Sequence, residues 1–532
     1  MTRLPRALLF TSALLAASCG ADLGAGDESL DEDSFAPDQI VGANSVGRRV
    51  SVDGWVYVPT NATTEAITNA VKSQMRVLFG AARAQGIGLS ERFPIINTAS
   101  FRRDTVSVVD PANPSAPARS LLRVRYTYRS RAVVNRALES ASTLPTATLF
   151  ATDYSRYAAD IIQKCHAADA HDVSAGSIWY HFDPSLPSCA ASISEERSRI
   201  DADRRRLTDP DRQVTPSEVS RRYLPLTMAF TPLESNEGAY PEYHRLFEDD
   251  RFLAYSFFGL DKEDDPYDYG AKNYFVYLRT LRAAWPSLQM SVPDGTDLLR
   301  VEWRGAVIPG VTLDRVTRWV LDRTDYPREV SSADVGAFRL ALLRRWRDHY
   351  VHFSARANVS VAGRARVVPI EIRTYYGDEE TDINAAARRY NAAFREADVF
   401  QYTGHSHLGR GPLDPNFYSA SSFPNSYQLL MVNSCVSFNY YNQFFRMHPG
   451  GTRNLDTITN GIEVYLEGAG VSSARFMIAL LDGRARTFRD MLGTMRVDLP
   501  WERAHDPNRV ADGELDNEYN PQRFPLTITP AN

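Results

Sequence analysis

Apolar runs of strand length alternate with segments of helical period in the C-terminal part of the chain. Residues 399–402 and 429–432 are largely apolar and bounded by turn residues, which predicts two buried strands. Residues 383–397 place apolar side chains on one helical face behind Asp382, a residue type that caps helices. Strands that alternate with helices favour a parallel sheet. We therefore expect residues 329–532 to form an α/β domain whose sheet is mostly parallel.

The N-terminal part shows a different pattern. Residues 50–58 alternate between apolar and polar side chains, as in a strand with one buried face. Apolar side chains then recur at helical spacing over residues 67–78, directly after the helix-start residues 60–63. Further strand-like segments follow, so we expect residues 48–222 to form a small α+β domain.

Residues 223–328 predict a second small unit. Strand-like segments at residues 226–230 and 252–260 precede a helical pattern over residues 271–284, and a hairpin turns at Arg304-Gly305. The acidic loop that begins at Asp261 is expected to be a solvated surface loop. We expect a second α+β domain here.

The first residues have the features of an export signal. Arg3 and Arg6 precede an apolar run at residues 7–15, which is too short to span a membrane as a mature helix. The small residues before Cys19 resemble the lipobox of bacterial lipoproteins. That resemblance implies that residues 1–19 hold a signal peptide cut before Cys19, and that Cys19 carries lipid. An ordinary secretory signal is the alternative.

The segment after this signal is rich in Gly, Ala and acidic residues. Such a composition buries little apolar surface, so residues 20–47 are expected to be a flexible acidic tether. Gly20 stands where lipoproteins kept at the inner membrane carry Asp, so the resemblance implies a cell-envelope protein anchored in the outer membrane. The membrane is then a partner through the lipid alone.

Composition narrows the classes of function. The chain has 532 residues, which is too long for one hydrophobic core, and 43% of them are hydrophobic and 23% charged, as in folded soluble domains. The formal net charge is −5, and no basic stripe of the kind that binds a phosphate backbone is visible. We expect no nucleic-acid partner.

The four cysteines have unequal expected roles. An exported protein matures in an oxidising compartment, where disulfides form. If Cys19 carries lipid, then Cys165 and Cys189, which are close in sequence, are the natural disulfide pair. Cys435 is left as an unpaired thiol, and such a thiol is either buried or used.

A histidine and this unpaired cysteine follow the two predicted strands. His405 comes just after residues 399–402, and Cys435 comes just after residues 429–432. The carboxyl ends of parallel strands share one edge of the sheet, where open α/β folds place their sites. An imidazole beside a thiol favours the thiolate and supplies an acid for the leaving group. This pair predicts acyl transfer with no cofactor and no metal.

Both motifs resemble those of a known group of enzymes. Tyr402-Thr403-Gly404-His405 and Asn433-Ser434-Cys435 look like the motifs of the clan CD cysteine peptidases, and the gingipain-like members come closest. The resemblance implies a caspase-like three-layer fold over about residues 330–490 and a peptide or protein substrate. It implies His405 and Cys435 as the catalytic dyad, with an oxyanion region at Gly404, Ser406 and Ser434.

Two other interpretations stay open. The family usually has Gly after the histidine, where this chain has Ser406, and this favours an inactive caspase-like lipoprotein that binds a partner or acts as a scaffold. Gly404-His405-Ser406-His407 also resembles the motif that closes calcineurin-like metallophosphoesterases, although the other metal-binding motifs of that class are missing.

Overall fold

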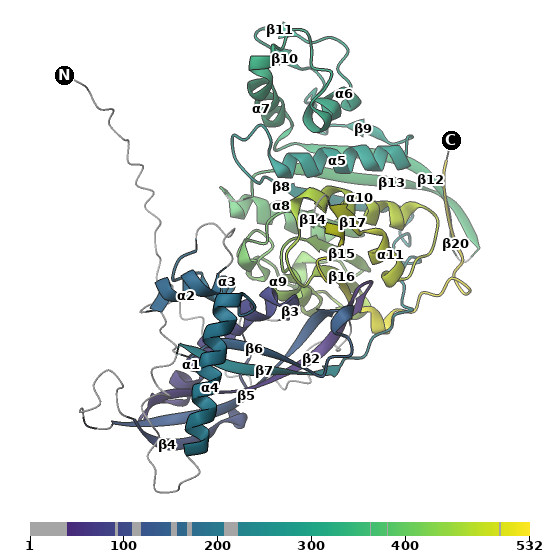
Figure 1. The fold of residues 1–532 in the computed structure, drawn as a ribbon. Coiled ribbons are helices and arrows are strands. Elements are labelled where there is room, and N and C mark those ends of the chain that lie inside the picture. Colours follow the sequence, from purple (N-terminus) through teal and green to yellow (C-terminus); the bar gives the residue numbers. More distant parts are fainter. Residues whose placement is uncertain are drawn as a thin grey trace, which may run out of the picture. The chain divides into compact units, whose positions relative to one another are not determined.

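A sheet of 16 strands organises the protein (Figure 1). The structure is a computed structural model, and it describes residues 40–90, 94–108, 117, 119–150, 157–166, 173–206, 222–361, 363–379, 381–499 and 502–531. The predicted signal peptide, Cys19 and residues 20–39 of the predicted tether lie outside these ranges.

Five neighbouring strands of this sheet run parallel. In spatial order they are β13 (Arg364–Gly377), β8 (Phe252–Gly259), β14 (Val399–Thr403), β15 (Gln428–Asn433) and β16 (Leu455–Asn460). All residues of β8, β14, β15 and β16 are buried. The first three therefore read as largely apolar runs rather than as alternating ones, whereas β16 also buries polar residues such as Asp456. The prediction that the strands before His405 and Cys435 are parallel neighbours is confirmed.

The sheet as a whole is mostly antiparallel, so the prediction of a mostly parallel sheet is wrong. The connection between β12 (Tyr350–Val361) and β13 is too short for a crossover, so these two strands form a hairpin. The antiparallel pairs also include β2 (Ser45–Pro59) with β5 (Arg119–Asn135), and β19 (Arg509–Asp512) with both β16 and β1 (Val41–Gly42). What the structure supports is a mixed α/β fold.

Helices cover both faces of the parallel strands. Tyr402 of β14 packs its ring 6.0 Å from that of Tyr390 in α8 (Ile383–Glu396), measured between centroids. The next residue, Thr403, bonds Ser473 of α10 (Leu466–Leu481) through its hydroxyl. Successive strand residues face opposite sides, so α8 and α10 lie on opposite faces of the sheet. Helix α5 (Tyr269–Ala284) packs against α10.

The N-terminal strands carry their own helices. As predicted, Thr63 caps the first of them, α1 (Thr64–Ala84), by accepting a hydrogen bond from the Ala66 N–H. The predicted disulfide between Cys165 and Cys189 is present, and it joins α2 (Ala158–Cys165) to α4 (Pro187–Arg206). A short helix, α3 (Ile178–His181), lies between them in the chain.

The predicted segment boundaries do not coincide with the edges of the sheet. Residues 41–42 and 45–47 lie in strands and are buried. The sequence assigns them to the tether, because the acidic stretch before them dominates the composition of residues 20–47. Strand β7 (Tyr223–Pro232) pairs with β2, and β8 lies between β13 and β14. Residues 223–328 therefore contribute strands to two separate parts of one sheet, with β8 in its interior.

The remaining elements complete the sheet and its periphery. The strands are β3 (Ile87–Leu89), β4 (Arg102–Val108), β6 (Thr143–Leu149), β9 (Gln289–Ser291), β10 (Glu302–Trp303), β11 (Ala306–Val307), β17 (Val497–Leu499), β18 (Glu502–His505) and β20 (Leu526–Pro530). The helices are α6 (Leu313–Thr317), α7 (Val335–Trp346), α9 (Phe438–Tyr441) and α11 (Phe488–Thr494). The predicted hairpin at Arg304-Gly305 is formed by β10 and β11.

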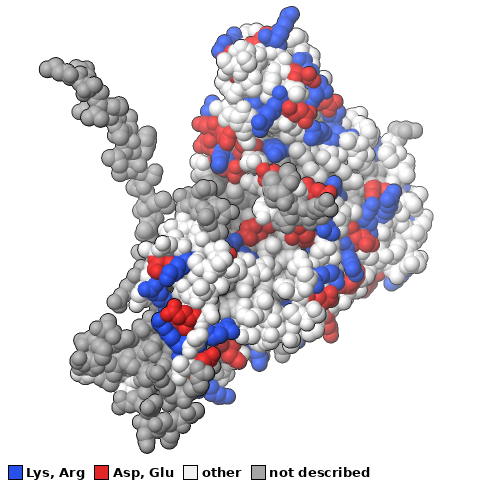
Figure 2. All heavy atoms as spheres, in the orientation of Figure 1, with Lys and Arg blue, Asp and Glu red and all other residues white. Residues whose placement is uncertain are grey.

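The apolar content of the helices and the distribution of surface charge can be compared with the sequence predictions. Within the described ranges, no helix is both long enough and apolar enough to pass through a lipid bilayer. Basic and acidic side chains are interspersed over the face drawn in Figure 2.

Candidate active site

The parallel strands change their direction of winding between β8 and β14. After β8 the chain enters the parallel part of the sheet at β13, on one side of β8, and then returns to β14 on the other side. In open α/β sheets the crevice outside the carboxyl ends of two such strands is the usual ligand site. Asp261 follows β8 and His405 follows β14, so both residues lie at this crevice.

Asp261 and His405 form a hydrogen-bonded pair. His405 Nε2 lies 2.9 Å from Asp261 Oδ1, and the two side chains are 39% and 11% exposed. A carboxylate in this position fixes the orientation of the ring and stabilises the imidazolium. The sequence predicts Asp261 in a solvated surface loop. The signal available in the sequence was its position just after a largely apolar run, but the place of that run in the sheet could not be predicted.

The register of β14 and β15 places the histidine and the cysteine at equivalent positions. Thr403 pairs with Asn433, and His405 and Cys435 follow that pair at the same offset. The Thr403 hydroxyl lies 2.7 Å from Ser473 Oγ, and Asn433 Nδ2 donates to the same oxygen over 3.1 Å. Both strands therefore present their last residues to α10. His405 and Cys435 therefore follow neighbouring parallel strands at the same edge of the sheet.

The backbone is strained just beyond each motif. His407 has φ of 48° and Val436 has φ of 46°. Left-handed backbone is unfavourable for any side chain and most of all for a β-branched one. The Val436 N–H donates to the Ile462 carbonyl over 3.1 Å, which helps to hold this conformation. Such strain concentrates at functional sites, although it does not by itself identify one.

Cys435 is the free cysteine among the described residues, and it is partly exposed. Its Sγ lies 3.7 Å from the Val464 carbonyl oxygen, to which the thiol donates. Burial of the sulfur raises the pKa of the Cys435 thiol, and the positive charge of Arg83 acts in the opposite direction. The Cys435 thiol is therefore protonated near pH 7.

The three residues of the predicted oxyanion region have structural contacts. At Gly404 a Cβ would lie 2.5 Å from the Tyr402 hydroxyl, so glycine is required for this close approach. Ser406 is buried and has right-handed backbone angles, φ −79° and ψ −14°, which suit any residue. Ser434 is buried as well. The side chains of both serines are therefore directed into the protein and do not line an open site.

The N-terminal helices form a wall beside the thiol. Arg83, at the end of α1, pairs with Glu463 and stacks 4.2 Å from the ring centroid of Tyr180 in α3. The Tyr180 hydroxyl donates to Glu463 Oε1 over 3.2 Å. The pKa of Tyr180 is raised to about 12, mainly by burial, with a further contribution from Cys435. The sequence analysis predicted none of these contacts.

His407, the second histidine of the motif, lies next to the pair formed by Asp261 and His405. His407 packs its ring 6.0 Å from that of His405, measured between centroids, and burial lowers its pKa to about 4. It is neutral near pH 7. Over the described part of the chain, no three His, Cys, Asp or Glu side chains are grouped so that they could hold a metal ion.

The site thus brings together the ends of three neighbouring strands, with Asp261, His405 and Cys435 following β8, β14 and β15. The chain matches no protein-family model, no curated protein sequence and no solved structure.

Proposed function

We propose that the protein is an exported, lipid-anchored cysteine peptidase in which Cys435 is the nucleophile and His405 is the general base. The observation that carries the proposal is the hydrogen bond between Asp261 and His405 at the switch point of the sheet, next to the strand that ends in the free cysteine. Five parallel strands with helices on both faces support a caspase-like arrangement of the C-terminal part.

The proposed reaction uses the two side chains in sequence. His405 takes the proton from Cys435 Sγ, the sulfur attacks the peptide carbonyl carbon, and a C–S bond forms. The C–N bond then breaks, and His405 returns the proton to the leaving amine. Water hydrolyses the resulting thioester, which releases the carboxylic acid and restores the thiol. Asp261 is a positioning residue, because it acts through His405.

Two properties of the site favour a second candidate, a module that binds a peptide without cleaving it. The resting thiol has a raised pKa, and Tyr180, Arg83 and Glu463 stand beside it. An active enzyme with this geometry has to lose the thiol proton when the substrate binds, since the free site does not stabilise the thiolate. Activity and binding therefore need separate measurements.

The test is covalent labelling of the full chain with peptide acyloxymethyl ketones, which react with an activated thiol. Labelling should map to Cys435 and disappear in C435A. In H405N the rate should fall about 100-fold, because a general base typically contributes 10²–10⁴-fold.

His349 offers a matched control, since its Nδ1 also lies close to a carboxylate, 2.7 Å from Asp294 Oδ2, and it precedes β12, which is not a neighbour of β14 or β15. H349N should label at the wild-type rate. If H405N does so too, Cys435 is only an accessible thiol, and the binding module becomes the better interpretation.

The lipid anchor is proposed on the sequence of residues 1–19 alone. Metabolic labelling with radioactive palmitate should mark the wild-type protein and should be absent from C19A, whose membrane fraction should also fall. A palmitate signal that persists in C19A would contradict the anchor without affecting the proposed chemistry.

A further inference from the structure

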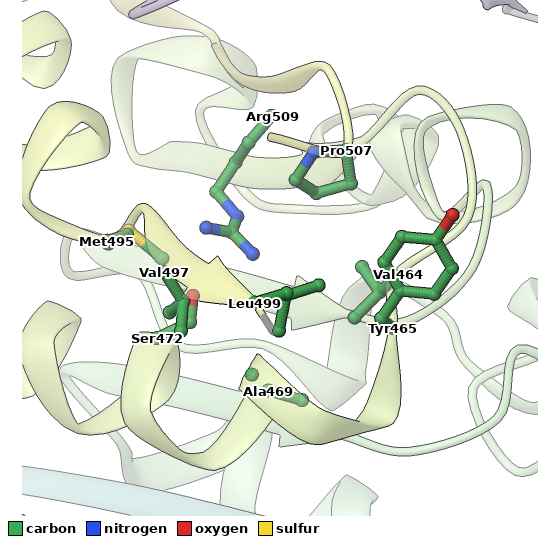
Figure 3. Close-up of a pocket in the computed structure, with 10 residues that line it drawn as sticks. Val464, Tyr465, Ala469, Ser472, Met495, Val497, Leu499, Pro507 and Arg509 are labelled. Atoms are coloured by element: carbon green, nitrogen blue, oxygen red, sulfur yellow. The ribbon is translucent and has the colours of Figure 1, made fainter. Parts of the chain in front are cut away.

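The small cavity bounded by α10, β17 and β19 belongs to the candidate active site (Figure 3). Val464 lines it, and the Val464 carbonyl accepts the hydrogen bond from Cys435. Arg509, also in its lining, is buried and donates to Asn433 and Asn460. A group of exposed arginines lies elsewhere, on the antiparallel strands β2, β4 and β5, which take no part in the proposed reaction.

The two faces of these strands differ in composition. Helix α1 covers the apolar face, where the Tyr126 hydroxyl of β5 donates to Gln74 Oε1 of α1 over 2.8 Å. The opposite face holds every second residue of three paired strands: Arg123, Arg125, Thr127, Arg129 and Arg131 of β5, Arg49, Ser51, Asp53, Trp55 and Tyr57 of β2, and Arg102 and Asp104 of β4. We call it the arginine face. No basic stripe was visible in the sequence, because these arginines alternate with other residues along each strand.

The arginine face is positively charged and accessible, on a chain whose formal net charge is −5. Four of its arginines are exposed: Arg49, Arg102, Arg125 and Arg129. Its two acidic residues have partners on the face itself. Asp104 Oδ2 accepts from Arg123 Nε over 2.9 Å, and Asp53 Oδ1 accepts from the Thr127 hydroxyl over 2.6 Å. The arginines therefore outnumber the carboxylates that could neutralise them.

The strand register sets arginines directly opposite each other. Arg102 lies opposite Arg125, and Arg49 lies opposite Arg131. Like charges at such positions destabilise a sheet. In the part of the chain that the structure describes, neither Arg102 nor Arg125 forms an ion pair or a side-chain hydrogen bond. Anionic groups bound across this pair would remove the repulsion.

Two aromatic residues accompany the arginines. Trp55 lies opposite Arg125 and Tyr57 lies opposite Arg123, and both aromatic residues are half-buried. Tryptophan and tyrosine are enriched where proteins meet a membrane–water interface, and guanidinium groups match phosphate oxygens. The face spans three strands and is a broad surface rather than a pocket, so it suits a layer of many phosphate groups better than one small anion.

The predicted tether joins the folded protein one strand before this face. It leads to β1, which pairs with the beginning of β2, the strand that carries Arg49 and Trp55. A flexible chain of about 20 residues has a root-mean-square end-to-end distance of about 25 Å. A lipid on Cys19 therefore gives the arginine face a high effective concentration at the bilayer.

We infer that the arginine face docks the folded protein onto a bilayer surface through the phosphate groups of anionic lipids. The choice of a membrane as the partner rests on the lipid anchor in the proposed function, whereas the peptidase chemistry is not needed for it. Because the contact is made by exposed charges, added salt weakens it.

The test is co-sedimentation of residues 20–532, the predicted mature chain without its lipid, with vesicles. One set of vesicles is phosphatidylcholine, and the other is an equal mixture of phosphatidylcholine and phosphatidylglycerol. All described residues are kept. The anionic vesicles should bind at least about ten-fold more tightly at low salt, and most of this preference should disappear near physiological ionic strength and above. Equal binding to both kinds of vesicle overturns the inference.

Two double variants assign the preference to the arginine face. R102Q/R125Q should weaken binding to the anionic vesicles about 25-fold, since each arginine near such a surface contributes about five-fold. R103Q/R328Q removes the same charge. Arg103 is exposed on the same strand but on the α1 side, where its Nη2 donates to Thr64 Oγ1 over 3.1 Å, and the Arg328 side chain is 94% exposed. This control should bind as wild type does.

Equal losses in the two double variants would show attraction by net charge alone and overturn the inference. If R102Q/R125Q does not fold, as judged by thermal unfolding, R125Q and R103Q repeat the comparison with one charge each. Duplex DNA is titrated into the same proteins. DNA binding that depends on Arg102 and Arg125, with no preference for anionic vesicles, assigns the face to nucleic acid and overturns membrane docking. Labelling of Cys435 and incorporation of palmitate at Cys19 are separate measurements, so failure of the peptidase or of the anchor is recognised independently.

Discussion

The parallel and antiparallel parts of the sheet differ in how many of their faces are buried. All residues of β8, β14, β15 and β16 are buried, because helices cover both faces of these strands. In β2, by contrast, buried residues such as Val52 alternate with exposed ones such as Asp53. The difference explains why β8, β14 and β15 read as largely apolar runs and β2 as an alternating pattern.

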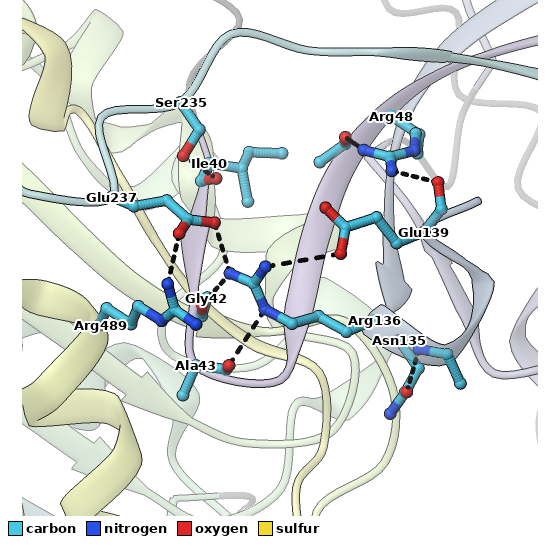
Figure 4. Close-up of polar contacts among 12 residues, drawn as sticks. Ile40, Gly42, Ala43, Arg48, Asn135, Arg136, Glu139, Ser235, Glu237 and Arg489 are labelled. Carbon is cyan, nitrogen blue, oxygen red and sulfur yellow. Dashed lines mark hydrogen bonds and ion pairs between the residues drawn. The ribbon is translucent and has the colours of Figure 1, made fainter.

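The two parts also contribute different things to the candidate site. Parallel strands bring their carboxyl ends to one edge, and that edge carries Asp261, His405 and Cys435. The antiparallel part contributes the wall formed by α1 and α3. Figure 4 shows how its strands attach to the C-terminal part: Arg136, after β5, and Arg489 of α11 both pair with Glu237. The parallel part holds the candidate site, and the antiparallel part borders it.

The largest expected effect tests this contrast in burial. Phe257 packs 4.5 Å from the Tyr390 ring in α8, and its neighbour Phe258 packs 5.0 Å from the Tyr277 ring in α5, measured between centroids. Because both faces are covered, F257A and F258A should each lower the free energy of unfolding by about 3–5 kcal/mol. Urea denaturation followed by circular dichroism measures the loss.

Consecutive residues of β2 are the control. V52A should cost about 2 kcal/mol, while D53A, on the exposed face, should stay within about 0.5 kcal/mol of wild type. If one of the two phenylalanine variants proves as mild as D53A, then one face of β8 is not packed as the structure has it.

The next effect concerns how Asp261 positions the histidine. D261N should reduce the labelling rate of Cys435 about 10- to 100-fold, because the amide no longer stabilises the imidazolium or fixes the tautomer. Partial recovery in D261E distinguishes positioning from a loss of folding. D294N removes the comparable partner of His349 and should have no effect. Equal rates in D261N and D294N would mean that the contact with His405 is incidental.

A buried carboxyl group at the opposite edge of the same strands predicts how the free energy of unfolding depends on pH. Asp398 precedes β14, and its Oδ2 accepts a hydrogen bond from the Leu253 N–H over 2.7 Å. Burial raises the pKa of Asp398 to about 8; Asp249 and Glu248 act in the same direction, and Arg251 opposes them. The folded state therefore holds the proton to higher pH than the unfolded chain, in which an aspartate has a pKa near 3.9.

Because of Asp398, the folded state loses stability as the pH rises. The contribution of Asp398 to stability is complete below about pH 4 and is lost as the pH rises toward about 8, by at most about 1.4 kcal/mol per pH unit. D398N keeps an acceptor for the Leu253 N–H and should remove this slope. Urea midpoints from pH 4.5 to 8 measure the difference between the two proteins. A D398N curve parallel to the wild type would show that Asp398 is ionised in the folded protein.

Local features of the fold were readable from the sequence where one segment decides the outcome. Thr63 and Asp382 cap their helices, and the β10–β11 turn lies at Arg304-Gly305, because caps and turns depend on neighbouring residues. The Cys165–Cys189 bond was predicted by counting the cysteines on the expectation that the chain is exported. The two strands before the candidate dyad followed from their continuous burial.

Long-range pairing was not readable. The sequence of residues 252–260 does not indicate that this strand pairs with β13 and β14. The place of Asp261 beside His405 could therefore not be predicted. The position of Arg509 in β19 was not predictable either, because its hydrogen-bond partners Asn433 and Asn460 precede it by many residues.

The smallest expected effect asks whether the antiparallel part restrains the thiol. Glu463 accepts from both Arg83 and Tyr180, so E463Q weakens the wall and also frees the Arg83 charge to act on Cys435, and both changes favour the thiolate. Alkylation of Cys435 by iodoacetamide at pH 7.5 should accelerate about three-fold. E467Q changes the hydrogen bond to Tyr269, so it is the nearby control and should react as wild type does.

R83M separates the two causes: it should slow alkylation if the charge dominates and accelerate it if loosening of the wall dominates. An unchanged rate in both E463Q and R83M would mean that α1 and α3 stand beside the thiol without influencing it, and the two parts of the sheet would then be coupled in structure alone.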